Sequence, residues 1–261
     1  EIIENVHRAT EVGITMVHLH ARDEASGSPT HHADVYQQII EGIRRFSPDL
    51  VVCVSLSGRN NIELQARAEP LTLDGLAKPD MGSLTLSSLN FNRQASVNTP
   101  DTIKSLAQMM MERHILPELE AFDSGMINYA KYLQKKGLLQ PPHYFNLIVG
   151  NIACAQANLL HIGVMVNDLP PESFWSLGGV GDAQFPVTAT SVIYGGGVRI
   201  GLEDNIWFDQ RRTRLASNQE LLHRIHNVAA MADRVVMAPT TFRRLLHLCP
   251  GSGKYGRAYG G

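Results

Sequence analysis

Two histidines separated by a single leucine, His18 and His20, follow a β-favouring run that begins at Ile14. Side chains on a strand alternate between its two faces, so both imidazoles should lie on the same face. The polar, turn-prone segment that begins at Arg22 places the pair near the carboxyl end of this strand. Neutral imidazole is the commonest transition-metal ligand, and two on one face supply half of a four-coordinate site. The spacing favours metal binding; the alternative is two structural histidines, satisfied in the core or exposed.

A second group of charged residues runs from Arg199 to the adjacent acids Glu203 and Asp204, after a glycine-rich strand entry. Buried charge is costly unless it is paired or bound to a metal. In a closed barrel the last strand returns to the first, so Glu203 could complete a site with His18 and His20 that keeps a position open for substrate. Asp204 would then be a separate base that Arg199 keeps ionised. The alternative is that both acids cap the following helical turn.

Small hydroxyl and glycine residues lie at the ends of the next two strands, where they could hydrogen-bond a substrate carboxylate or simply form turns. They are Ser55, Ser57, Gly58, Ser83 and Thr85. Two acids, Glu118 and Glu120, share one face of a later strand. Glu120 is nearer the strand end, and we expect it to be the partner that orients a metal-binding histidine.

Apolar runs of strand length alternate with helical patterns along the whole chain. The expected strands are 14–20, 50–56, 81–86, 115–122, 144–149, 174–178 and 197–201, and the expected helices are 1–12, 34–46, 63–77, 101–113, 126–136, 156–166, 186–194 and 219–232. Such alternation predicts parallel strands joined by crossover helices. The fold class is therefore α/β, and we expect a (β/α)₈ TIM barrel whose first strand lies upstream of Glu1. An open doubly wound sheet is the alternative, but its GxGxxG fingerprint is missing.

The length of 261 residues fits one domain, which we place at 1–250, followed by a glycine-rich, mobile tail at 251–261. The composition is 44% hydrophobic and 18% charged, with a net charge of −2, which gives no attraction to nucleic acid. Three cysteines without CxxC spacing argue against a disulfide framework and fit a cytoplasmic setting. No apolar run is long enough to cross a membrane.

Five segments together resemble the β-keto acid cleavage enzyme family, and they occur in the same order over nearly the whole chain. The segments are His18–Asp23, Ser55 to Gly58, 81–84, 117–123 and 198–205. The resemblance implies a zinc-dependent TIM barrel, with another divalent metal as an alternative. Its partners would be a small β-keto acid and acetyl-CoA, and the protein is expected to be a homo-oligomer.

Carried over by position, the resemblance assigns a role to each candidate residue. His18, His20 and Glu203 would hold the metal; Asp204 would be the base and Arg199 its partner; Ser55, Gly58, Ser83 and Glu120 would bind or support the keto acid. The expected products are acetoacetate and a new acyl-CoA, formed by a retro-Claisen route. We expect Asp204 to remove a proton from the acetyl methyl group, and the resulting enolate to attack the metal-bound ketone before the adduct collapses.

Two departures and two rival functions accompany this interpretation. The family's first strand carries a residue that contacts the distal end of the substrate, and this strand has no counterpart here because the sequence starts at the following helix. Ser83 stands where a threonine is usual. A metal-dependent hydrolase of the amidohydrolase type also uses His-x-His, but it usually needs further histidines at later strand ends. The other alternative is a non-catalytic metal-binding barrel, against which the presence of Arg199 and Asp204 argues.

Overall fold

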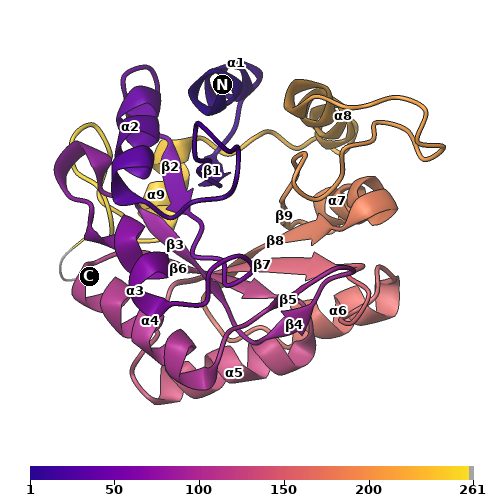
Figure 1. The fold of residues 1–261 in the computed structure, drawn as a ribbon. Coiled ribbons are helices and arrows are strands. Elements are labelled where there is room, and N and C mark those ends of the chain that lie inside the picture. Colours follow the sequence, from indigo (N-terminus) through magenta and orange to yellow (C-terminus); the bar gives the residue numbers. More distant parts are fainter. Residues whose placement is uncertain (259–261) are drawn as a thin grey trace.

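The computed structural model describes residues 1–258 and has one continuous parallel sheet. Seven strands follow one another in chain order and curl into a half-barrel, with helices on the outside (Figure 1). They are β1 (Met16–Leu19), β2 (Val51–Val54), β3 (Met81–Thr85), β6 (Leu116–Ala121), β7 (His143–Val149), β8 (Ser173–Gly179) and β9 (Gly197–Val198). The partial (β/α)₈ barrel predicted from the alternation is confirmed.

The helices connect successive strands and bury one apolar face each. They are α1 (Ile2–Val12), α2 (Ala33–Arg44), α3 (Leu64–Ala68), α4 (Pro100–Glu112), α5 (Ser124–Lys135), α6 (Leu159–Asn167), α7 (Gln184–Ile193), α8 (Asn218–Met231) and α9 (Pro239–Leu245). Several begin at the residue that the sequence favours: the Thr99, Asp123 and Asn158 side chains each accept a backbone N–H of the first turn. None of the helices within residues 1–258 is long and apolar enough to cross a membrane.

The expected helix over 63–77 is shorter than predicted. It is divided into α3, η1 (Glu69–Thr72) and η2 (Gly75–Ala77). Pro70 lies at the start of η1 and lacks the N–H that would continue the α-helical hydrogen bonding. The sequence analysis also did not predict α9, nor a hairpin of two short strands, β4 (Leu89–Asn90) and β5 (Ala95–Ser96).

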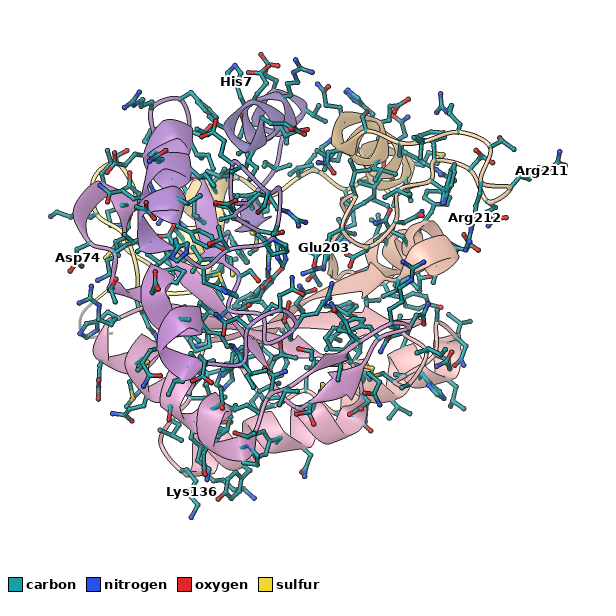
Figure 2. The ribbon with its side chains drawn as sticks, in the orientation of Figure 1. His7, Asp74, Lys136, Glu203, Arg211 and Arg212 are labelled. Carbon is teal, nitrogen blue, oxygen red and sulfur yellow. The ribbon has the colours of Figure 1, made fainter. Side chains whose placement is uncertain are left out.

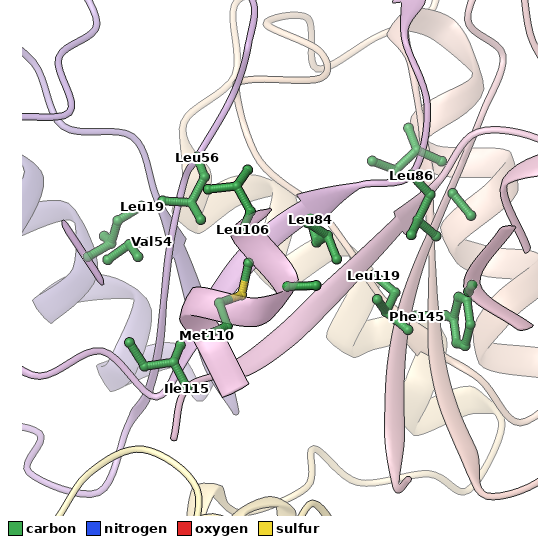
Figure 3. Packing of buried hydrophobic residues seen from close by; sticks show 14 of the residues in the cluster. Leu19, Val54, Leu56, Leu84, Leu86, Leu106, Met110, Ile115, Leu119 and Phe145 are labelled. Atoms are coloured by element: carbon green, nitrogen blue, oxygen red, sulfur yellow. The ribbon is translucent and has the colours of Figure 1, made fainter. Parts of the chain in front are cut away.

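The main hydrophobic core lies between the sheet and its helices. Leu84 and Leu119 from adjacent strands pack there with Leu106 and Met110 of α4 (Figure 3). The strand residues that alternate with this layer point to the inside of the half-barrel, where His18, Glu118 and Asn146 are found. The packed outer layer therefore fixes which side chains face the interior.

The C-terminal segment differs from the expected mobile tail. Tyr255 is buried, and the backbone N–H of Gly256 donates to the Asp80 carboxylate at 3.1 Å. Arg257 N donates to the carbonyl of His114. Glycine-rich sequence indicated mobility, but these contacts attach residues 251–258 to the amino ends of the strands. Residues 259–261, the rest of the predicted tail, lie outside the described part of the chain.

Candidate active site

The carboxyl end of β1 meets the turn that follows β9. His20 Nε2 lies 3.0 Å from Glu203 Oε1, although the two residues belong to opposite edges of the sheet. Figure 2 shows Glu203 in the middle of the half-barrel, whereas His7, Asp74 and Lys136 lie at the periphery. The rings of His18 and His20 are stacked with centroids 5.0 Å apart, as expected for alternate residues on one face. The structure therefore brings together the three residues predicted to hold a metal.

His18 is held from behind by a buried carboxylate. Its Nδ1 lies 2.5 Å from Glu118 Oε2, which leaves Nε2 for another partner. Burial alone would lower the pKa of His18, but the adjacent Glu118 carboxylate raises it to about 9. Burial opposes ionisation of Glu118 as well, and His18 nevertheless holds the pKa of this carboxyl below its usual value.

The side chain of Glu118 has partners for both of its oxygens. Asn146 Nδ2 donates to Oε1 at 3.2 Å, and the Cys53 thiol donates to Oε2 at 3.3 Å. Burial and the Glu118 charge raise the pKa of Cys53, so the thiol stays protonated as a donor. The prediction that Glu120 orients the histidine is therefore wrong: Glu118, one layer deeper in the half-barrel, has that position.

Arg199 joins three carboxylates on the opposite side of the site. Its Nε donates to Asp204 Oδ2 at 2.9 Å, its Nη2 donates to Glu203 Oε2 at 2.7 Å, and its Nη1 lies 3.6 Å from Glu120 Oε1. Burial opposes the charged form of Glu203, but Arg199 and His20 hold the pKa of Glu203 well below its ordinary value. The alternative that Glu203 and Asp204 cap a helix is wrong, since α8 is capped by Ser217.

A small cleft of about 40 Å³ opens beside these groups. Its lining includes His20, Glu203, Asp204, Arg199, Glu120, Ser55 and Thr85. Ser55 Oγ is buried and finds no hydrogen-bond partner within residues 1–258, so it is available to a ligand. Ser55 also lies beside the histidines, because its N–H donates to the Leu19 carbonyl at 3.1 Å.

Two of the predicted substrate contacts have other surroundings. Ser83 does not line the cleft; its hydroxyl accepts the Leu56 N–H at 2.9 Å. Thr85, two residues nearer the strand end, lines the cleft and donates to Glu120 Oε2 at 2.6 Å. The contact of Ser83 with the substrate stays a prediction, and Thr85 is a further candidate because it lines the cleft. Gly58 permits close packing, because a Cβ there would lie 2.4 Å from the Val97 carbonyl oxygen.

His18, His20 and Glu203 offer the donor types that a divalent metal accepts, two imidazoles and one carboxylate. His20 Nε2 is buried and makes no hydrogen bond to any described residue, even though Glu203 Oε1 is 3.0 Å away. Two imidazole nitrogens and one carboxylate form a donor set typical of catalytic zinc. Within residues 1–258, however, the three side chains whose ligand atoms lie within 4.8 Å of one another are His18, Cys53 and Glu118. Two ligands of one tetrahedral zinc stand about 3.3 Å apart, so the 2.5 Å between His18 and Glu118 is better explained as a hydrogen bond.

Sequence reasoning overlooked several residues that the structure places at the site. Cys53, Asn146 and Arg59 carried no distinguishing pattern. Glu118 and Thr85 were recognised as members of pairs, but Glu120 was chosen as the partner of the histidine and Ser83 as the substrate contact. On the adjacent strands β3 and β6, Ser83 pairs with Glu118 and Thr85 pairs with Glu120, so the two residues of each pair lie at the same depth in the half-barrel.

Comparisons with known proteins indicate the family of the chain. Residues 1–248 match the beta-keto acid cleavage enzyme family. The 3-keto-5-aminohexanoate cleavage enzyme of Fusobacterium nucleatum is 34% identical over 249 residues, covering 95% of this chain and 89% of the relative. The 3-oxoadipate:acetyl-CoA acetyltransferase of Cupriavidus necator is 32% identical over 251 residues, covering 95% and 86%.

The fold is also that of a solved structure, the apo form of ObcA. The two superpose with a TM-score of 0.83 at 19% identity, over 94% of this chain. The chain spans 64% of the length of ObcA, less than two thirds. At this identity the likeness establishes the fold alone. With the family match over nearly its whole length and relatives above 30% identity, the chain belongs to the beta-keto acid cleavage enzyme family.

Proposed function

We propose that this protein transfers the acyl group of a β-keto acid to coenzyme A, using acetyl-CoA and releasing acetoacetate. One observation carries the proposal: His20 Nε2, which makes no hydrogen bond to a described residue, lies 3.0 Å from Glu203 Oε1 and beside Asp204, which Arg199 orients. Family membership supplies the reaction class, since curated relatives are named as cleavage enzymes or acetyl-CoA transferases for β-keto acids.

Carbon balance decides where the reaction begins. Acetoacetate must join the acetyl group to the CH₂COO⁻ unit of the keto acid. An enolate formed at the acetyl methyl group, the route considered from the sequence, would instead expel acetate when the adduct collapses. The proton therefore leaves C2 of the keto acid, which lies between ketone and carboxylate and is the more acidic carbon.

The remaining steps follow from that carbanion. C2 attacks the thioester carbon of acetyl-CoA, and the CoA thiolate leaves. The thiolate then adds to C3, the C2–C3 bond breaks in a retro-Claisen step, and C2 recovers its proton. The products are acetoacetate and the new acyl-CoA, with atoms and charge in balance.

Asp204 is the group we assign to remove and return the C2 proton. Its side chain lines the cleft, and Arg199 Nε fixes Oδ2 at 2.9 Å, which leaves the other carboxylate oxygen for the substrate. Positioning matters because carbon acids transfer protons slowly unless acid and base are held close together. Ser55, with its unpartnered hydroxyl, is the proposed donor to the substrate carboxylate, and Glu120 supports Arg199.

His18, His20 and Glu203 are the proposed metal ligands, with zinc as the expected ion. A metal here would supply a Lewis acid that polarises the keto group. The neutral imidazoles of two ligands leave such an ion with net positive charge. Glu118 would hold His18 in the orientation that presents Nε2.

Metal content and acetoacetate release test the proposal together. We expect one zinc per chain and acetyl-CoA-dependent acetoacetate formation from at least one member of a panel of β-keto acids. His20→Ala should lose both metal and turnover, whereas Asp204→Asn should keep the metal and lose about 10²-fold or more in kcat. His223→Ala, an exposed histidine on α8, is the matched control and should behave as the parent.

The rival functions predict other results. Turnover of a substrate without acetyl-CoA, with metal retained, would indicate a hydrolase. Metal binding without any turnover would indicate a binding protein. Unchanged metal content in His20→Ala would contradict the proposed ligand set.

A further inference from the structure

The cleft contains a second arginine, Arg59, that the proposed reaction does not use. Arg59 lines the cleft in the loop after β2, and its guanidinium carbon lies 4.1 Å from the ring centre of Phe91. Its Nε is buried and has no hydrogen-bond partner within residues 1–258. Arg199, by contrast, is matched by three carboxylates. Arg59 is therefore the cleft cation whose charge no described carboxylate balances.

Stacking on Phe91 restricts the Arg59 side chain to one position while its N–H groups stay free to donate. A guanidinium lying over an aromatic ring keeps its N–H groups in the guanidinium plane, where they are free to donate. Phe91 is itself held edge-to-face against Phe122, with ring centroids 6.0 Å apart. Because the stack restricts the side chain before binding, less conformational entropy is lost when an anion arrives.

The position of Arg59 separates it from the groups that handle the reacting end of the substrate. Ser55 lies against the histidine strand, and its free hydroxyl is available to the carboxylate beside the ketone. Arg59 lies farther along the loop, on an apolar wall that includes Leu89 and Phe91. A substrate with its keto group near His20 would direct its tail along this wall. An anionic end of the tail is the chemistry that an unbalanced guanidinium recognises.

We propose that Arg59 selects β-keto acids whose tail ends in a carboxylate, that is, dicarboxylic substrates. The inference rests on the proposed function, since it assumes a β-keto acid in this cleft. A neutral tail would leave the guanidinium without a counter-charge, and a cationic tail would be repelled. Arg59 is thus a specificity residue, while the chemistry stays with Asp204 and its neighbours.

The test compares two six-carbon ligands that differ only at the tail, 3-oxoadipate and 3-oxohexanoate. Their binding to the purified, metal-loaded protein is measured by calorimetry without acetyl-CoA, so that no transfer takes place. We expect 3-oxoadipate to bind roughly 10- to 100-fold more tightly, the range for a hydrogen-bonded charge pair. Arg59→Gln should abolish this difference and leave the affinity for 3-oxohexanoate within about twofold.

Arg93→Gln is the matched control, because Arg93 is an exposed arginine between β4 and β5 and does not line the cleft. It should preserve the preference for 3-oxoadipate. If Arg59→Gln lowered the affinity for both ligands equally, Arg59 would bind the carboxylate that they share. If it weakened only the binding of acetyl-CoA, Arg59 would bind the CoA phosphates. Either result overturns the proposal, as does equal binding of both ligands by the parent protein.

Turnover is measured separately on the same preparations. A parent protein that prefers 3-oxoadipate but forms no acetoacetate would refute the proposed function and leave the role of Arg59 in place. A parent protein that turns over both acids with equal kcat/KM and binds them equally would refute the role of Arg59 alone.

Discussion

The contact between His18 and Glu118 has the form of a histidine oriented by a carboxylate behind it. A carboxylate on Nδ1 fixes the ring and makes Nε2 a better electron donor to a metal. Glu118 is 1% exposed and keeps its charge because His18, Cys53 and Asn146 all face it. An isolated carboxylate would be too costly at this depth. The buried carboxylate of Glu118 is therefore fully partnered, and its contact with Nδ1 would hold the His18 ring in one orientation.

Replacing Glu118 by Gln should weaken metal binding without removing a ligand. We expect zinc affinity to fall roughly 10- to 100-fold, because a neutral amide orients the imidazole less strongly than a carboxylate does. Competition with a chromophoric chelator measures the dissociation constant directly. Glu112→Gln, at an exposed position on α4, should leave it unchanged. Equal affinities in the parent and Glu118→Gln would show that Glu118 does not position a ligand.

Residue type and spacing predicted which side chains converge, but not how deep each one lies. The His-x-His pair, Glu203, Asp204 and Arg199 come together as expected. The difficult choices were between residues two positions apart on one strand: Glu118 or Glu120, where the choice was wrong, and Ser83 or Thr85. Alternation puts both members of such a pair on the same face. Their depth depends on strand register and tilt, which neighbouring strands determine.

At the scale of elements, long periodic segments were predictable and short ones were not. The strands and main helices lie within a few residues of their predicted ranges. The hairpin of β4 and β5 was missed because strands of two residues show no alternation. This hairpin matters for function, since Leu89 and Phe91 from it line the cleft.

Two glycines provide a prediction about the elements beside the site. Gly179 ends β8, and a Cβ there would lie 2.5 Å from the Ala183 carbonyl oxygen. Gly179→Ala must shift backbone, so unfolding free energy should fall by about 1–3 kcal/mol. Gly163→Ala on α6 meets open space and should raise it by about 0.5–1 kcal/mol, the helix propensity difference. Urea denaturation measures the unfolding free energy of each variant. A Gly179→Ala variant more stable than the parent protein would contradict the steric argument.

At the scale of the whole molecule, a buried ion network joins distant segments at the amino ends of the strands. Arg243 of α9 donates to both oxygens of Asp80 at 2.8 Å, and Arg44 of α2 approaches the same carboxylate at 3.4 Å. The N–H groups of Val52 and Gly256 also donate to Asp80. One aspartate thus attaches the C-terminal segment and two helices to the sheet, on the opposite side from the cleft.

Asp80→Asn should destabilise the protein by about 3–5 kcal/mol, since two buried guanidinium groups lose their counter-charge. The exposed pair of Asp74 and Arg113 offers a control: Asp74→Asn should change stability by about 1 kcal/mol or less. Urea unfolding followed by circular dichroism compares the two variants. Similar losses of unfolding free energy in both variants would mean that the network at Asp80 contributes no more to stability than a surface ion pair does.

Strand order was predictable for the whole molecule because crossover helices permit few topologies. The packed C-terminal segment was not, because glycine content gives no sign of a distant aspartate. Zinc as the metal, a homo-oligomeric assembly and a cytoplasmic setting stay predictions.

The meeting of His20 and Glu203 has a mechanical consequence. β1 and β9 are the outer strands of the sheet, and the two residues link them through side chains. An ion held by both would act as a clip across the open side of the half-barrel and would close the chain from residue 20 to residue 203 into one loop. Loop-closure entropy grows slowly with length, so a clip over a long loop stabilises the folded state somewhat more than a clip over a short one. The thermal midpoint should then rise with metal concentration, by the ordinary rule for a ligand that binds only the folded state.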